Sequence, residues 1–165
     1  METDWKAIVW GQFGAAIDAL ENAIVACPDD LWSDRSKYPE YWYLASHTIF
    51  WLDYYLTDPA EEFTPPEPFG LEELDPAGVM PERPYTKDEL LTYLRYCRNK
   101  CRMTIEALSD EQVNRLYDFG KVSLNFGELL LYNMRHVQHG VAQLNLILRQ
   151  TIDSAPRWTF TARED

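Results

Sequence analysis

The sequence lacks several features that mark other classes of protein. No run of apolar residues approaches the ~18 that a membrane span needs, and no low-complexity tract interrupts the chain. Basic residues are few, 15 Lys and Arg against 27 Asp and Glu, which gives a net charge of -12. Because such a chain repels phosphate backbones, we expect no nucleic-acid partner. The opening METDWK leads into no uninterrupted apolar block, so we expect no signal peptide, no membrane association and a cytoplasmic location.

Cysteine is also scarce. Cys27, Cys97 and Cys101 form an odd number without a CxxC pair, which argues against a disulfide framework and against a structural zinc knuckle. Cys97 and Cys101 lie one helical turn apart, a spacing compatible with a shared metal ion or a redox pair. The same two residues continue an apolar stripe that includes Leu94 and Ile105. We therefore expect them to act as small buried hydrophobic side chains.

The sequence does contain apolar residues at helical spacing, and it shows no credible pair of strands. At 165 residues and 46% hydrophobic content, it predicts one domain over residues 1–150. A polar tail, 151–165, follows; its Trp158 and Phe160 are candidates for packing on the bundle or on a partner, and we expect its end to be mobile. The apolar pattern predicts four long helices. They cover residues 4–27, 39–56, 86–108 and 126–150.

Three capping signatures indicate where helices begin. A Ser, Thr or Asn followed three residues later by Glu or Gln lets each side chain cap the other residue's backbone N–H. The pairs are Thr86 and Glu89, Ser109 and Gln112, and Asn125 and Glu128. The second pair predicts a short extra helix, which Gly120 would close.

Helices with one apolar face bury that face most economically against one another. The sequence therefore predicts an all-α protein, a four-helix bundle. Most of the ten prolines lie between residues 59 and 84, which indicates an irregular connection of about thirty residues. Because such a connection can span the length of a bundle, we expect one long crossover between the second and third helices.

The last predicted helix carries polar residues on a face that should point inward. At 100° per residue around the helix axis and with His136 at zero, Asn133 lies at about 60°, Gly140 at about 40° and Gln143 at about -20°. Leucine and isoleucine residues share this arc, so we expect it to face the bundle interior. His139 lies at about -60°, at the edge of the same face.

The second predicted helix also directs a histidine inward. Tyr43, Trp51 and Tyr54 lie within about 40° of His47, so this imidazole projects from an aromatic face. A buried polar group left unpaired costs on the order of 1–3 kcal/mol, so the inward polar side chains must bind one another, water or a ligand. A satisfied hydrogen-bond network is one solution. Imidazoles converging from two helices favour a binding site.

Gly140 is the least expected residue of the inward face. Inside a helix, glycine is less favourable than alanine by ~1 kcal/mol. The absence of a side chain either leaves room for a ligand one turn beyond His136 or permits a close approach of two helices. The sequence pattern does not decide between these explanations.

Two segments resemble a known family. YLASHTIFWLDYYL in the second helix and NFGELLLYNMRHVQHGVAQLNLILRQ in the last are similar to the DinB/YfiT-like family of bacterial four-helix bundles. The resemblance implies an up-down-down-up bundle, often a homodimer, with a three-histidine metal site. One ligand comes from the second helix and two come from the last, one turn apart. Some members are thiol-dependent S-transferases or isomerases, and many have no known activity.

By this resemblance, His47 corresponds to the ligand of the second helix and His136 to the first ligand of the last helix. Gly140 occupies the position of the third ligand, and glycine has no side chain that binds a metal. His139 corresponds to a neighbouring position that is often histidine in the family without being the ligand. It completes the set only if its side chain turns inward.

Two functions from different classes follow. The first is a metal-dependent enzyme of S-transferase or hydrolase type, with zinc or nickel held by His47, His136 and His139. The second is a metal-free protein, a small-molecule binder or a structural bundle, in which Gly140 has replaced the third ligand. Both permit a homodimer, because the last helix is apolar over most of its circumference. The residues expected to contact a small molecule are Tyr43, Trp51, Tyr54, Asn133, Gly140 and Gln143.

Overall fold

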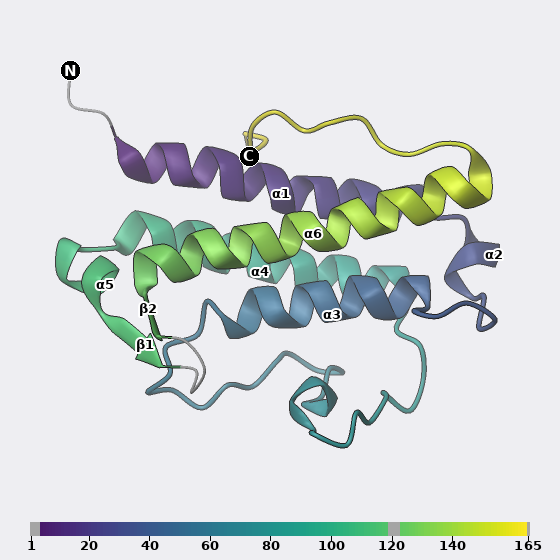
Figure 1. Cartoon of the computed structure of the whole chain (residues 1–165), viewed down its shortest axis with the longest axis horizontal. Helices are drawn as coiled ribbons and strands as arrows, with labels where there is room; N and C mark the ends of the chain where they lie inside the picture. Colours follow the sequence, from purple (N-terminus) through teal and green to yellow (C-terminus); the bar gives the residue numbers. More distant parts are fainter. Residues whose placement is uncertain (1–3, 119–122, 165) are drawn as a thin grey trace.

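A computed structural model describes residues 4–118 and 123–164, which are mostly helical (Figure 1). These residues form six α-helices, one 3-10 helix and a two-stranded antiparallel sheet. In chain order the elements are α1 (Trp5–Ala26), α2 (Asp29–Trp32), α3 (Tyr41–Tyr54), η1 (Glu72–Leu74), α4 (Lys87–Ala107), α5 (Asp110–Asn114), β1 (Leu116–Asp118), β2 (Ser123–Asn125) and α6 (Phe126–Ile152).

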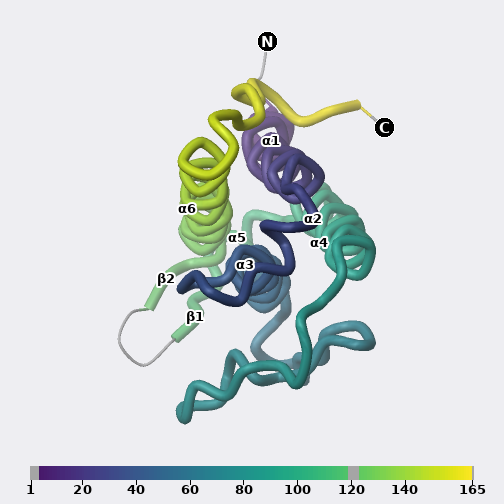
Figure 2. Tube along the Cα trace, turned by 90° about the vertical axis from the view of Figure 1, so that its right-hand side faces the viewer, coloured from purple at the N-terminus to yellow at the C-terminus, as the bar shows by residue number. Residues whose placement is uncertain are grey.

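Four long helices lie side by side and enclose the core. α1 packs against α4 and α6, and α3 packs against the same two helices (Figure 2). Between them lies a cluster of buried hydrophobic side chains, among them the fully buried Phe13, Trp42 and Leu144. The connection from α3 to α4, which contains η1, runs on the outer side of α3 (Figure 2). Every helix of the described residues is too short or too polar to cross a membrane.

The three predicted capping boxes are confirmed. At the start of α4, α5 and α6, the cap side chain accepts a hydrogen bond from the backbone N–H three residues on, and the Glu or Gln at that position reaches back to the cap. These reciprocal bonds satisfy backbone donors that the helix itself cannot pair. The predicted helix starts therefore follow from local chemistry.

The stretch between α5 and α6 differs from the prediction. α5 ends at Asn114, and β1 then pairs with β2, with Tyr117 opposite Leu124. The expectation that the chain has no strand pair is therefore wrong. Tyr117 is buried and its ring lies 5.2 Å from that of Phe126, whereas its two neighbours in β1 are exposed. Gly120, which we expected to close the short helix, lies outside the described residues.

The tail beyond α6 folds back along α1 (Figure 1). The backbone N–H of Ala162 donates to the carbonyl of Gly11 across 2.8 Å. The carboxylate of Asp18, only 1% exposed, accepts from the backbone N–H of Arg163 at 2.7 Å and from Arg98 Nε at 2.9 Å. Burial opposes ionisation of Asp18, but these hydrogen bonds prevail and lower the pKa of its carboxyl. Ala162 and Arg163 of the tail are thus hydrogen-bonded to α1.

Candidate functional site

Two histidines from different helices meet in the structure. His47 of α3 and His136 of α6 lie with their ring centroids 5.5 Å apart. The contact arises where α3 packs against α6, so the inward faces predicted for the two helices meet here. The ring of Tyr43 lies 6.2 Å and that of Trp51 6.3 Å from the ring of His47. The pair therefore has aromatic neighbours on the α3 side.

The carboxylate of Glu73, in η1, holds His47 in place. Its Oε2 accepts a hydrogen bond from His47 Nδ1 at 2.7 Å and another from Trp51 Nε1 at 3.1 Å. Burial opposes ionisation of Glu73, but hydrogen bonds from His47, Tyr43 and Trp51 outweigh it and lower the pKa of the carboxyl. Because a carboxylate only accepts, neutral His47 carries its proton on Nδ1 and keeps the lone pair of Nε2 available.

Among the described residues, His136 carries an unsatisfied buried atom, as does Asn133 through its Oδ1. That atom of His136 is Nε2, which has no hydrogen-bond partner in the part of the chain that the structure describes. Burial lowers the pKa of His136 to about 4, and the nearby His47 and His139 act in the same direction. The imidazole is therefore neutral at pH 7. It presents a buried nitrogen beside the Glu73-bound His47, and a ligand could bind that nitrogen.

The remaining predicted residues lie around the pair in different ways. Asn133 is fully buried, and its Nδ2 donates to the carbonyl of Leu52 at 3.0 Å, which ties α6 to α3. Gln143 is half-buried, and His139 is exposed. Tyr54 packs edge-on against Phe63 at 5.2 Å and lines a separate cavity. The structure thus gathers His47, His136, Tyr43 and Trp51, and leaves His139 outside.

Gly140 allows α3 and α6 to approach closely. A Cβ atom added at this residue would lie 2.3 Å from Oγ1 and 2.8 Å from Cγ2 of Thr48. Thr48 is completely buried, and its hydroxyl donates to the carbonyl of Leu44 at 2.7 Å. The space beside Gly140 is therefore filled by a packed side chain. Of the two explanations that the sequence left open, the structure supports helix packing.

The residues present fit only part of the family's metal site. Two imidazole nitrogens at about 2.1 Å from one ion place their ring centroids about 5 Å apart in tetrahedral geometry, which the 5.5 Å separation approaches. The family's third ligand is missing at its position, because Gly140 has no side chain. His139 is exposed. Within the described ranges, no cluster of three or more His, Cys, Asp or Glu side chains is arranged to hold a metal ion. The three-histidine site does not fit this chain.

Glu73 is the functional candidate that sequence reasoning missed. It lies in the irregular crossover, where no helical or strand period shows which side chains point inward. Only the fold brings it to a residue 26 positions earlier in the chain. The sequence signal was limited to the acidic pair Glu72 and Glu73, which by itself indicates a solvated loop.

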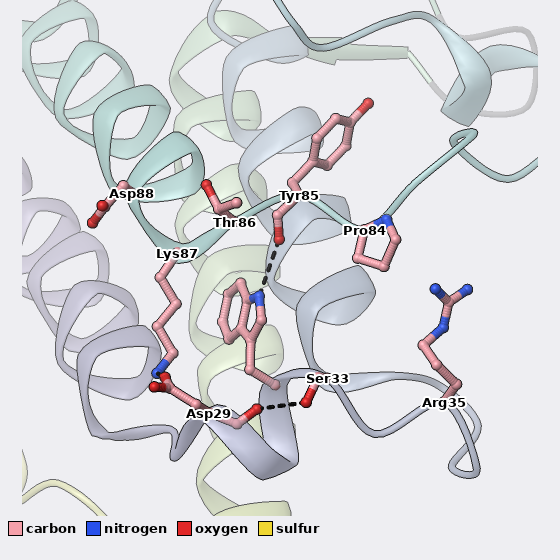
Figure 3. A pocket seen from close by; sticks show the side chains of 9 residues that line it. Asp29, Ser33, Arg35, Pro84, Tyr85, Thr86, Lys87 and Asp88 are labelled. Carbon is pink, nitrogen blue, oxygen red and sulfur yellow. Dashed lines mark hydrogen bonds and ion pairs between the residues drawn. The ribbon is translucent and has the colours of Figure 1, made fainter.

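A cavity of about 670 Å³ lies elsewhere, between α2 and the start of α4 (Figure 3). Several of its polar groups are already paired with one another. Lys87 Nζ lies 2.6 Å from Asp29 Oδ1, and Trp32 Nε1 donates to the carbonyl of Tyr85 at 3.0 Å. Because these groups need no ligand, the cavity is a weaker candidate than the histidine pair. The residues that line it are Asp29, Trp32, Ser33, Arg35, Pro84, Tyr85, Thr86, Lys87 and Asp88.

Comparisons with known proteins identify a family. Searches among curated proteins and among solved structures found no similar protein. A family model of the DinB superfamily matches residues 12–144, a span that contains α3, most of α6 and both paired histidines. The chain therefore belongs to the DinB superfamily.

Proposed function

We propose that this DinB-superfamily protein binds a small molecule at the paired histidines and performs acid–base chemistry on it without a resident metal. The observation that carries the proposal is the buried, unpartnered Nε2 of His136 beside a histidine whose Nδ1 is held by a carboxylate. An unpaired buried nitrogen is unfavourable by about 1–3 kcal/mol, and a ligand that hydrogen-bonds to it removes this penalty.

The two histidines have different roles in this proposal. His47 Nε2 is the general base, because Glu73 fixes its tautomer and stabilises the imidazolium that forms when it takes a proton. His136 stays neutral and hydrogen-bonds the ligand, since its low pKa prevents it from competing for that proton. A ligand hydroxyl, thiol or water would lose the proton. This chemistry suits the thiol S-transferase type that the resemblance implies, and it also suits a hydrolase.

A metal-dependent enzyme is the competing proposal. It requires a third protein ligand, which Gly140 cannot supply and which His139 supplies only after leaving its exposed position. Near-stoichiometric zinc or nickel in protein purified without chelator would favour this alternative. No step of the proposed acid–base chemistry depends on such an ion.

We also propose the up-down-down-up order of helices, with one domain over residues 1–150. In Figure 1, α1 and α6 run from left to right, whereas α3 and α4 run from right to left. The crossover joins the two helices that run in the same direction, which explains its length. The tail packs on this domain through α1.

A homodimer in the cytoplasm is a further proposal. Of the apolar residues of α6, Leu131 and Leu146 are 49% and 52% exposed, whereas Leu130 and Val141 are buried in the chain itself. The exposed leucines leave an apolar surface that a second copy would cover. The three cysteines are unpaired and buried, as is usual in reducing compartments. Sedimentation equilibrium of wild type and of Leu131→Gln tests the dimer.

Hydrolysis of p-nitrophenyl acetate tests the histidine chemistry. We expect the wild type to release p-nitrophenol in the presence of a chelator, because a neutral imidazole attacks the ester, or activates water to attack it, without a metal. His47→Gln should lose most of this activity, and Glu73→Gln should lose part of it. The matched control is His139→Gln, which removes an exposed histidine. Equal loss in His47→Gln and His139→Gln, or loss of activity on chelation, would overturn the proposal.

A further inference from the structure

A second cavity, of about 310 Å³, lies beside the end of α3, under the first part of the crossover and next to β1 and the start of α6. Four aromatic residues line it: Tyr54, Tyr55, Phe63 and Tyr117. The ring of Tyr54 stands at 83° to that of Phe63 and at 74° to that of Tyr55, with centroids 5.2 and 5.8 Å apart. The volume suits a small ligand.

The charged residues that line this aromatic cavity are all acidic. Asp58, Glu61 and Asp118 line it, and no basic side chain does so within the described residues. Ring faces carry negative potential and attract cations, and the carboxylates act in the same direction. An anionic ligand would meet repulsion from both. The lining therefore selects for positive charge.

The chain itself places a cation at the rim of the cavity. The guanidinium of Arg115 lies 5.7 Å from the ring centroid of Tyr117 and bonds Asp58 Oδ2 at 2.6 Å. A ring and a carboxylate of the lining thus already hold one positive group together. Glu61 also lines the cavity, and the structure shows no ion pair for its carboxylate among the described residues.

We propose that this cavity is a binding site for a small organic cation, such as an alkylammonium group, lined by the Tyr54, Tyr55 and Phe63 rings and neutralised by Glu61. The site differs from the histidine pair, which does not line it. Tyr55 lies between the two, with its ring 6.3 Å from that of His136. The inference does not depend on the acid–base chemistry proposed above.

Calorimetric titration with choline and with 3,3-dimethyl-1-butanol tests the site, because the alcohol has the same shape without the charge. We expect choline to bind at least about tenfold more tightly than the alcohol. Phe63→Leu keeps an apolar side chain without the ring and should weaken choline binding by about tenfold. Glu61→Gln should weaken it by about threefold. Glu62→Gln, an exposed neighbour with the same charge change, should leave binding unchanged.

A variant that strengthens binding guards against loss of binding through misfolding. Arg115→Gln removes the cation that occupies Asp58 and should tighten choline binding by about threefold, because that carboxylate becomes available. Equal affinity for choline and its neutral analogue would overturn the proposal. So would no choline binding by wild type with an unchanged circular dichroism spectrum, or equal effects of Glu61→Gln and Glu62→Gln.

Discussion

Replacement of Gly140 by alanine tests how α3 and α6 meet. The added Cβ would lie 2.3 Å from Thr48 Oγ1, so Thr48 must move, yet its buried hydroxyl is hydrogen-bonded to the Leu44 carbonyl at 2.7 Å. Overpacking of this kind is unfavourable by about 1–3 kcal/mol, and a contact with a fully buried, hydrogen-bonded side chain belongs in the upper part of that range, about 2–3 kcal/mol. The higher helix propensity of alanine offsets ~1 kcal/mol. We therefore expect Gly140→Ala to lower the free energy of unfolding by about 1–2 kcal/mol.

Urea unfolding followed by circular dichroism measures this change, and a double variant isolates its cause. Thr48→Ala removes the two nearest atoms, Oγ1 and Cγ2, and leaves only the Cβ of residue 48, at 3.1 Å, against the new Cβ. In the Thr48→Ala background, Gly140→Ala should therefore be neutral or stabilising, so the two substitutions should couple by about 1–3 kcal/mol. Wild-type stability or better in Gly140→Ala alone would refute the close approach of the helices and would restore the idea of free space beside Gly140.

Three further predictions concern buried polar groups. The pKa of His136 is about 4 in the folded state, below its ordinary value of 6.5, so between these pH values the folded state binds fewer protons than the unfolded state. The free energy of unfolding should therefore fall as pH drops from about 6.5 to 4. Allowing for partial exposure, we expect His136→Gln to remove about 1–2 kcal/mol of this pH dependence, measured by urea unfolding at pH 7 and pH 4.5. The folded-state pKa of Glu73 is lowered, so its carboxylate stabilises the folded state above its ordinary pKa, and this stabilisation is lost as pH falls through the folded-state pKa. Glu73→Gln should therefore be destabilising at pH 7 and nearly neutral at pH 3 in the same assay. Asp53 is 1% exposed, and its carboxylate accepts hydrogen bonds from Lys100 Nζ at 2.6 Å and from Tyr93 Oη at 2.8 Å. Asp53→Asn should lower the melting temperature, because the free energy of unfolding falls by about 2–3 kcal/mol. An unchanged melting temperature would contradict a stabilising role of the Asp53–Lys100 ion pair.

The parts of the fold that depend on local chemistry were predictable. Thr86, Ser109 and Asn125 each cap a helix through a partner three residues away, and the observed helices begin where these residues predict. The β-hairpin was not predictable in the same way. Its strands are three residues long, and Tyr117 is buried by contact with Phe126, a contact that exists only after the chain has folded.

The site was predictable only where it follows from the geometry of a single helix. Helical geometry placed His47 and His136 on inward faces, and the packing of α3 on α6 brought their rings together. The partner of Gly140 depends on how far one helix is shifted along the other, which no periodicity encodes. Thr48 was therefore not foreseen.

The tail shows a similar limit. Trp158 and Phe160 were the natural candidates for packing because they are large and apolar, yet both are exposed. The contact is made instead by Ala162, whose Cβ lies 2.5 Å from the place that a Cβ at Gly14 would occupy. A small residue opposite a glycine gives no signal in a hydrophobic pattern.

The metal content of protein purified without chelator tests the central claim most directly. The account predicts far less than one zinc or nickel ion per chain, because His47 and His136 lack a third protein ligand. Near-stoichiometric metal in the wild type, lost in His47→Ala, would contradict it and would show that the chain completes the family's metal site in another way.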